Sequence, residues 1–121
     1  MGAVRVLVAD VDAALPGWAA AGYAVAERWG PPFAILEAEG MPDLWLSGPG
    51  TSAARTVEGL APGDAASASV RPVLEVDDVE QTVALLSAAG WTPVGEAVSG
   101  PGGSQRLLRQ GPVFLEVFSA G

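Results

Sequence analysis

The sequence predicts an α+β fold built from two tandem βαβββ modules. Two observations lead to this prediction: a strand–helix pattern occurs twice, and a turn followed by an apolar strand also occurs twice, in the same order. The chain has 121 residues, half of them apolar, which is the size of one domain with its own core. We therefore expect a single domain made of an N-terminal module at 1–48, a linker at 49–66 and a C-terminal module at 67–121.

The strand–helix pattern is the longer repeat. Residues 4–23 read VRVLVADVDAALPGWAAAGY and residues 72–91 read PVLEVDDVEQTVALLSAAGW, with Asp10 and Asp78 at the same place in each copy. Each copy has an alternating apolar strand, an acidic helix cap, about ten helical residues and an Ala-Ala-Gly-aromatic stop.

The second repeat places EGMPDLWL at 39–46 beside QGPVFLEV at 110–117. The two copies of this repeat lie three residues farther apart in the sequence than the two copies of the first repeat. We therefore place an extra loop in the second module, at GPGG, 100–103. We expect GPGGS to form a mobile hairpin loop. It lacks the Gly-Lys-Ser/Thr ending of a phosphate loop, and no helix follows it.

The remaining elements follow in chain order. We expect strands at 3–9, 23–29, 33–39, 42–47, 68–76, 92–98, 105–110 and 112–118, and helices at 12–21 and 79–89. Pro16 and Gly17 should shorten or bend the first helix, which the packing of Leu15 and Trp18 should hold in place. The linker is rich in Gly, Pro, Ala, Ser and Thr and shows no sustained period.

Composition excludes several kinds of function. The chain has no cysteine and no histidine, which removes disulfides, thiol nucleophiles, Ser-His-Asp triads and the commonest metal ligand. Its net charge of −8 argues against nucleic acid as a partner. No apolar run is long enough for a membrane span, and the N-terminus lacks the pattern of a signal peptide, so we expect a cytoplasmic protein with no membrane partner.

The doubled βαβββ pattern, with Val-x-Asp-Val-Asp/Glu before each helix, resembles the vicinal oxygen chelate superfamily over residues 3–47 and 68–118. This group includes glyoxalase I, extradiol dioxygenases and the bleomycin-resistance proteins. The resemblance implies curled mixed sheets around a cavity and a homodimer. It allows the modules to pair within one chain or between two chains.

The resemblance also places the superfamily's four metal-ligand positions at Ala3, Trp45, Arg71 and Glu116. Of these side chains only Glu116 could bind a divalent cation. We therefore expect no metal and no cofactor.

Strand alternation gives a map of the cavity wall. The side chains expected in the core are Val4, Val6, Val8, Leu44, Leu46, Pro72, Leu74, Val76, Val113, Leu115 and Val117, together with Tyr23 and Trp91. The side chains expected to bind a ligand are Arg5, Trp29, Phe33, Asp43, Trp45, Arg71, Arg106, Phe114 and Glu116.

Several of these side chains have a second interpretation. Trp45 either stacks on a ligand or only fills the space left by the metal. Arg71 and Glu116 either contact a ligand or neutralise each other as a buried ion pair. Arg106 either reaches an anionic substituent or lies in solvent. Trp29 and Phe33 either form an aromatic rim or pack a turn.

These features favour a metal-independent binding protein that sequesters an antibiotic or another planar, aromatic and possibly cationic metabolite, as the bleomycin-resistance proteins do. The alternative is an enzyme: a metal-free isomerase or cyclase, or a glyoxalase-type lyase or dioxygenase that has lost its metal site. Such an enzyme would use Glu116, Glu75 or Asp43 as acid or base, with Arg71 stabilising an oxyanion.

Overall fold

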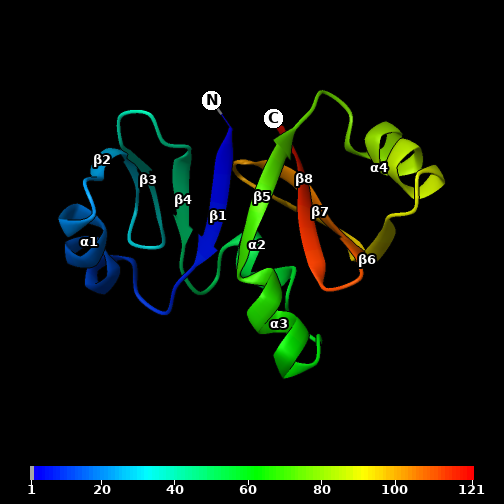
Figure 1. Cartoon of the computed structure of the whole chain (residues 1–121), viewed down its shortest axis with the longest axis horizontal. Helices are drawn as coiled ribbons and strands as arrows, with labels where there is room; N and C mark the ends of the chain where they lie inside the picture. The colour runs from blue at the N-terminus through cyan, green and yellow to red at the C-terminus, as the bar shows by residue number, and fades with distance from the viewer. Residues whose placement is uncertain (1) are drawn as a thin grey trace.

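The computed structural model describes residues 2–121 and contains one curled, eight-stranded mixed sheet (Figure 1). The first module contributes β1 (Ala3–Leu7), α1 (Val11–Ala20), β2 (Ala24–Trp29), β3 (Phe33–Glu37) and β4 (Asp43–Ser47). The second contributes β5 (Val70–Glu75), α4 (Val79–Ala88), β6 (Thr92–Gly100), β7 (Gly103–Gln110) and β8 (Val113–Ala120). The predicted α+β class and both βαβββ modules are confirmed.

The two modules join at the centre of the sheet, whose strand order is β2-β3-β4-β1-β5-β8-β7-β6. In each module the first strand pairs in parallel with the last, β1 with β4 and β5 with β8. Strands β1 and β5 pair antiparallel, with Arg5 opposite Arg71. The modules therefore pair within one chain.

Both long helices begin at the predicted acidic caps. The Asp10 carboxylate accepts a hydrogen bond from the amide of Ala13, and Asp78 accepts one from the amide of Gln81. Pro16 and Gly17 were expected to shorten or bend the first helix. It is not shortened, because α1 and α4 both have ten residues. Tertiary packing overrides the low helix propensity here. As expected, Leu15 and Trp18 pack against the core of the first module.

The outer face of each module carries a separate apolar core under its helix. In the first module Val6, Val11, Leu36, Leu44 and Leu46 form this core. In the second module it consists of Val79, Val83, Leu108 and Val117. Tyr23 and Trp91 pack against these two cores, as predicted from the helix stops.

Of the predicted core row of β5, only Val76, just after the strand, packs against the core of the second module. Leu74 is 40% exposed, Val70 is 61% exposed and Pro72 is also exposed. At the start of β8, Val113 is likewise exposed rather than buried. Figure 1 shows the reason for β5: α1 lies over the β2–β4 side of the sheet and α4 over the β6–β8 side, so the outer face at the junction stays uncovered.

The linker contains two short helices, α2 (Ser52–Arg55) and α3 (Pro62–Ala68), so its residues are not all irregular. Residue 68 belongs to α3 and not, as expected, to the following strand. These helices lie below β5 in Figure 1. Val57 and Leu60, which lie between the two helices, pack together with Val94 against an inner cluster formed by Ala68 of α3, Leu107 and Phe114.

The three extra residues of the second module do not form a long loop. Strand β6 ends at Gly100 and strand β7 begins at Gly103, so only Pro101 and Gly102 make the turn. The Ser99 and Ser104 hydroxyls hydrogen-bond across this hairpin at 2.9 Å. The insertion thus lengthens the strands instead. No helix within residues 2–121 is long and apolar enough to cross a membrane.

Candidate functional site

A cavity of about 490 Å³ opens on the inner side of the sheet, and both modules contribute to its wall. This volume lies in the range of roughly 300–1,000 Å³ that small-molecule sites occupy. The wall is formed by Arg5, Trp29, Pro32, Phe33, Ile35, Trp45, Ser47, Glu75, Gln105, Phe118 and Ala120, by residues 50–53, by Arg55 and by residues 101–103.

Four aromatic side chains form one continuous side of this cavity. Neighbouring ring centroids are 6.1 Å apart from Trp29 to Phe33, 6.4 Å from Phe33 to Trp45, and 5.3 Å from Trp45 to Phe118. The planes of each pair lie near 80° to one another, which is the favoured edge-to-face geometry. Each ring packs against the next, so the row forms an aromatic surface of edges and faces along the cavity.

The floor of the cavity is a buried ion network centred on Glu116. Arg5 donates through Nε to Oε1 at 3.1 Å and through Nη2 to Oε2 at 2.7 Å. Arg71 donates to Oε1 through Nε at 3.0 Å, and its Nη2 lies 2.9 Å from the same oxygen. Both carboxylate oxygens of Glu116 therefore have guanidinium partners, and the three side chains are between 0 and 4% exposed.

Arg71 also holds the linker against the sheet. Its Nη1 donates to the carbonyl of Ala68 at 2.9 Å, and its Nη2 donates to the carbonyl of Ala53 at 3.3 Å. Burial lowers the pKa of Arg71, while the negative charge of Glu116 opposes that shift. An arginine remains protonated at neutral pH even so.

Arg5 is the network member that reaches the cavity surface. Its Nη1 donates to the Ser47 hydroxyl at 3.0 Å. Its Cζ lies 5.0 Å from the centre of the Trp45 ring, 5.9 Å from that of Phe33 and 6.0 Å from that of Phe118. The aromatic row thus encloses a cation that belongs to the protein itself.

Comparison with known proteins gives matches among solved structures. A protein from Legionella pneumophila named NAD-dependent benzaldehyde dehydrogenase aligns with 13% identity and a TM-score of 0.75, over 100% of both chains. A hypothetical protein from Bacillus halodurans aligns with 16% identity and a TM-score of 0.67, over 98% of this chain and 92% of that one. Methylmalonyl-CoA epimerase from Mycobacterium tuberculosis aligns with 18% identity and a TM-score of 0.62, over 98% and 86%.

The chain shares its fold with these three proteins. At these identities the likeness concerns the fold alone. No family model and no curated protein matches the sequence.

A metal ion, which the sequence resemblance to the vicinal oxygen chelate superfamily would imply, does not fit this cavity. Its four ligand positions, as the resemblance places them, carry Ala3, Trp45, Arg71 and Glu116. The Glu116 carboxylate is bound by two guanidinium groups, which would repel a divalent cation. Within residues 2–121 no three Asp, Glu, His or Cys side chains come together as a ligand set.

Four of the nine predicted site residues line the cavity: Arg5, Trp29, Phe33 and Trp45. Glu116 lies beneath the surface and contacts Arg5. Trp29 is half-exposed at the rim, where its indole nitrogen donates to the Glu27 carboxylate at 3.2 Å. Arg71 lies behind Glu116 and is not part of the cavity surface.

Three predicted site residues lie elsewhere. Phe114 shares a strand face with Glu116 but lies in the inner cluster that the linker covers. Asp43 shares a face with Trp45 but lies outside the cavity wall, at the other end of β4 from Ser47. Arg106 points away from the cavity because its neighbour Gln105 points inward, and its guanidinium donates to the carbonyl of Gly95.

The linker and β7 supply site residues that the sequence analysis missed. Gln105 is buried beside Arg71 at the floor, and Arg55 lies at the mouth, where it donates to the carbonyl of Ser99 at 2.9 Å. Two local signals mark the linker helices: Thr51 is an N-cap that accepts from the amide of Ala54, and Pro62 is at the start of α3.

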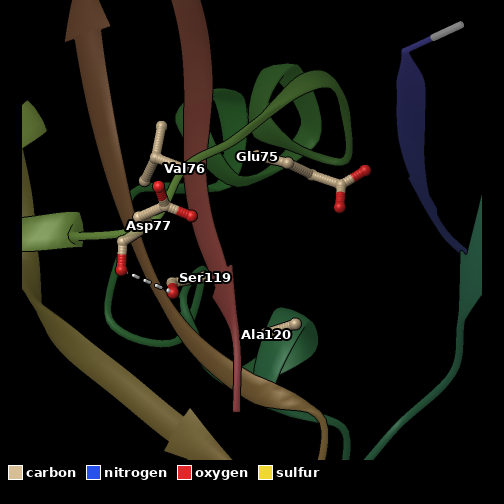
Figure 2. Close-up of a pocket in the computed structure, with 5 residues that line it drawn as sticks. All are labelled: Glu75, Val76, Asp77, Ser119 and Ala120. Atoms are coloured by element: carbon tan, nitrogen blue, oxygen red, sulfur yellow. Dashed lines mark hydrogen bonds between the residues drawn. The ribbon is translucent and has the colours of Figure 1, made fainter.

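A second hollow of about 370 Å³ lies at the ends of β5 and β8 (Figure 2). Val76, Asp77, Ser119 and Ala120 line it, and the Ser119 hydroxyl donates to the carbonyl of Asp77 at 3.1 Å. Glu75 lines both hollows, and Figure 2 shows its carboxylate directed away from Asp77. This open, polar surface lacks the aromatic wall of the larger cavity.

Proposed function

We propose that this protein is a metal-independent small-molecule-binding protein that sequesters a planar compound, such as an antibiotic or an aromatic secondary metabolite. The observation that carries the proposal is the row of four aromatic side chains along a cavity of about 490 Å³. Planar ligands gain both apolar burial and stacking from such a wall. The Glu116 carboxylate at the floor is already bound by two arginines, which favours ligand binding over a reaction that uses a metal ion.

The proposed binding site is complete within one chain, because β1, β4, β7 and β8 of the same chain all contribute to its wall. The homodimer that the resemblance implies is part of the proposal. In that assembly each chain binds its own ligand, so the stoichiometry is one ligand per chain whatever the oligomeric state.

One observation favours an enzyme as the second candidate. Glu75 is the carboxylate on the cavity wall, and no salt bridge of the described residues involves it. Glu116 is less suited to acid–base work because both its oxygens already accept from arginines. A metal-free isomerase or cyclase would therefore depend on Glu75. Glu75→Gln should abolish the turnover of such an enzyme without abolishing ligand binding.

The test uses 2-naphthylmethanol, a neutral planar probe, and isothermal titration calorimetry on the full chain. We expect saturable binding of one probe per chain, unchanged by EDTA or by added Zn²⁺ or Mn²⁺. Chromatography of the mixture after prolonged incubation should return the probe unaltered. Binding that requires a metal would overturn the proposal, and so would the absence of binding across a panel of planar antibiotics and metabolites.

A further inference from the structure

We infer that the natural ligand of this cavity carries an anionic oxyacid group, such as a carboxylate, on its planar ring system, and that this group contacts Arg5. This inference rests on the proposed function and assigns the chemical class of its ligand. It differs from what the acidity of the whole chain suggests, since a net charge of −8 would by itself favour a cationic partner.

The first argument is the charge of the cavity floor. Arg5 and Arg71 contribute two positive charges there, and Glu116 contributes a single negative charge. All three side chains are almost completely removed from solvent. The network therefore carries a net positive charge of one, and a net charge in a buried site is costly. A ligand anion would supply the missing negative charge.

The second argument is the set of donors on Arg5. A guanidinium group has five N–H bonds. Among the described residues, Arg5 uses three of them, two toward Glu116 and one toward Ser47. Because Arg5 also lines the cavity, its two remaining N–H bonds are the strongest donors at the floor. They suit a carboxylate oxygen better than a neutral acceptor.

The third argument excludes a ligand cation from the aromatic row. Quaternary ammonium and similar ligands bind in cages of aromatic faces. Here Trp45, Phe33 and Phe118 already surround the guanidinium of Arg5, at 5.0 to 6.0 Å from its Cζ. A cationic ligand at this place would meet a like charge in a medium of low dielectric constant.

The mouth of the cavity does not reverse this preference. Arg55 and Glu75 both line it, one of each sign. The guanidinium of Arg55 is fixed by hydrogen bonds to the Ser99 carbonyl and the Ser52 hydroxyl. Because the two mouth charges cancel, the floor determines the sign of the ligand.

The experiment compares three probes that share one ring system: 2-naphthoate, 2-naphthylmethanol and 2-naphthylmethylammonium. We expect naphthoate to bind at least about tenfold more tightly than the alcohol, and the ammonium to bind more weakly than the alcohol. Non-specific attraction to a protein of net charge −8 would give the opposite order. Equal affinities, or tighter binding of the ammonium, would overturn this inference while leaving the proposed function in place. If none of the three binds, this inference fails, and the panel of planar antibiotics and metabolites decides whether the proposed function fails as well.

A pair of charge-matched variants tests the same point without disturbing the buried network. Glu75→Gln removes a negative charge from the cavity wall, and Glu58→Gln removes one from an exposed turn outside it. We expect Glu75→Gln to tighten naphthoate binding by a factor of about two to five at low salt, with the alcohol unaffected. Glu58→Gln should leave both affinities unchanged. An equal effect of both variants on naphthoate would show that net charge, and not the cavity, sets the preference.

Discussion

Arg5 and Arg71 are direct cross-strand partners in the β1–β5 pair that joins the two modules. Like charges at such positions destabilise a sheet. Here Glu116 of the neighbouring strand β8 accepts hydrogen bonds from both guanidinium groups and compensates one of the two charges. The junction of the modules and the floor of the cavity therefore depend on the same carboxylate.

Glu116→Gln should be strongly destabilising. The substitution keeps the shape of the side chain but leaves two buried guanidinium groups without a negative partner, which typically costs about 3–5 kcal/mol. Urea unfolding followed by tryptophan fluorescence measures the free energy of unfolding. Glu58→Gln, at an exposed position, is the control and should change it by less than about 0.5 kcal/mol. Similar values for the two variants would show that the network contributes little to stability.

Replacing all three charged side chains together should lower the stability of the fold less than replacing Glu116 alone. In the variant Arg5→Met, Arg71→Met, Glu116→Leu no buried charge is left unpaired, and apolar replacements of buried ion networks are often neutral or stabilising. In this variant the carbonyl of Ala68 loses its hydrogen-bond donor, Arg71, and this loss lowers the free energy of unfolding by roughly 1–3 kcal/mol. We expect this triple variant to unfold at a higher urea concentration than Glu116→Gln and to show no preference for naphthoate. A triple variant less stable than the single one would contradict the view that unpaired charge is the main cost.

Trp45→Ala should weaken the binding of planar ligands. Trp45 contacts Phe33 and Phe118 edge to face, so its removal interrupts the aromatic row at its centre. We expect a loss of about 1–3 kcal/mol in the binding free energy of 2-naphthylmethanol, measured by calorimetry. Leu85→Ala, which truncates an exposed apolar side chain on α4, is the control and should bind as the parent does. Unchanged affinity in Trp45→Ala would place the ligand elsewhere.

Gly103→Ala should lower the melting temperature, whereas Gly102→Ala should not. Gly103 has a φ of +143°, and a Cβ atom there would collide with the carbonyl oxygen of Ser119 on β8. A Cβ on Gly102 would meet no atom within 4 Å. We expect a cost of about 1–3 kcal/mol for the first substitution, seen by differential scanning calorimetry. If both variants melt like the parent, the hairpin is not held against β8 as described.

The modules could be predicted from the sequence repeats, because each module contains the same local pattern: an acidic cap, about ten helical residues and a glycine stop. Alternation then placed Arg5, Trp45 and Glu116 on one face correctly. The same reasoning failed at Leu74, because alternation identifies the two faces of a strand but does not reveal which face a helix covers. It also failed at Phe114, since the linker that covers this side chain shows no hydrophobic period. The ion pair between Arg71 and Glu116 was one of the two interpretations that the sequence offered, and the structure shows it. The contact of Arg5 with Glu116 depends on the register between the two modules, which no local pattern contains.

The contact between Arg5 and Glu116 spans 111 residues of the chain. One of the two belongs to β1 and the other to β8, the first and last strands in chain order. During translation this contact therefore cannot form until β8 has left the ribosome. Proteolysis within the linker, followed by separation of the halves, would divide the cavity wall between two fragments, so neither fragment would keep the complete proposed binding site.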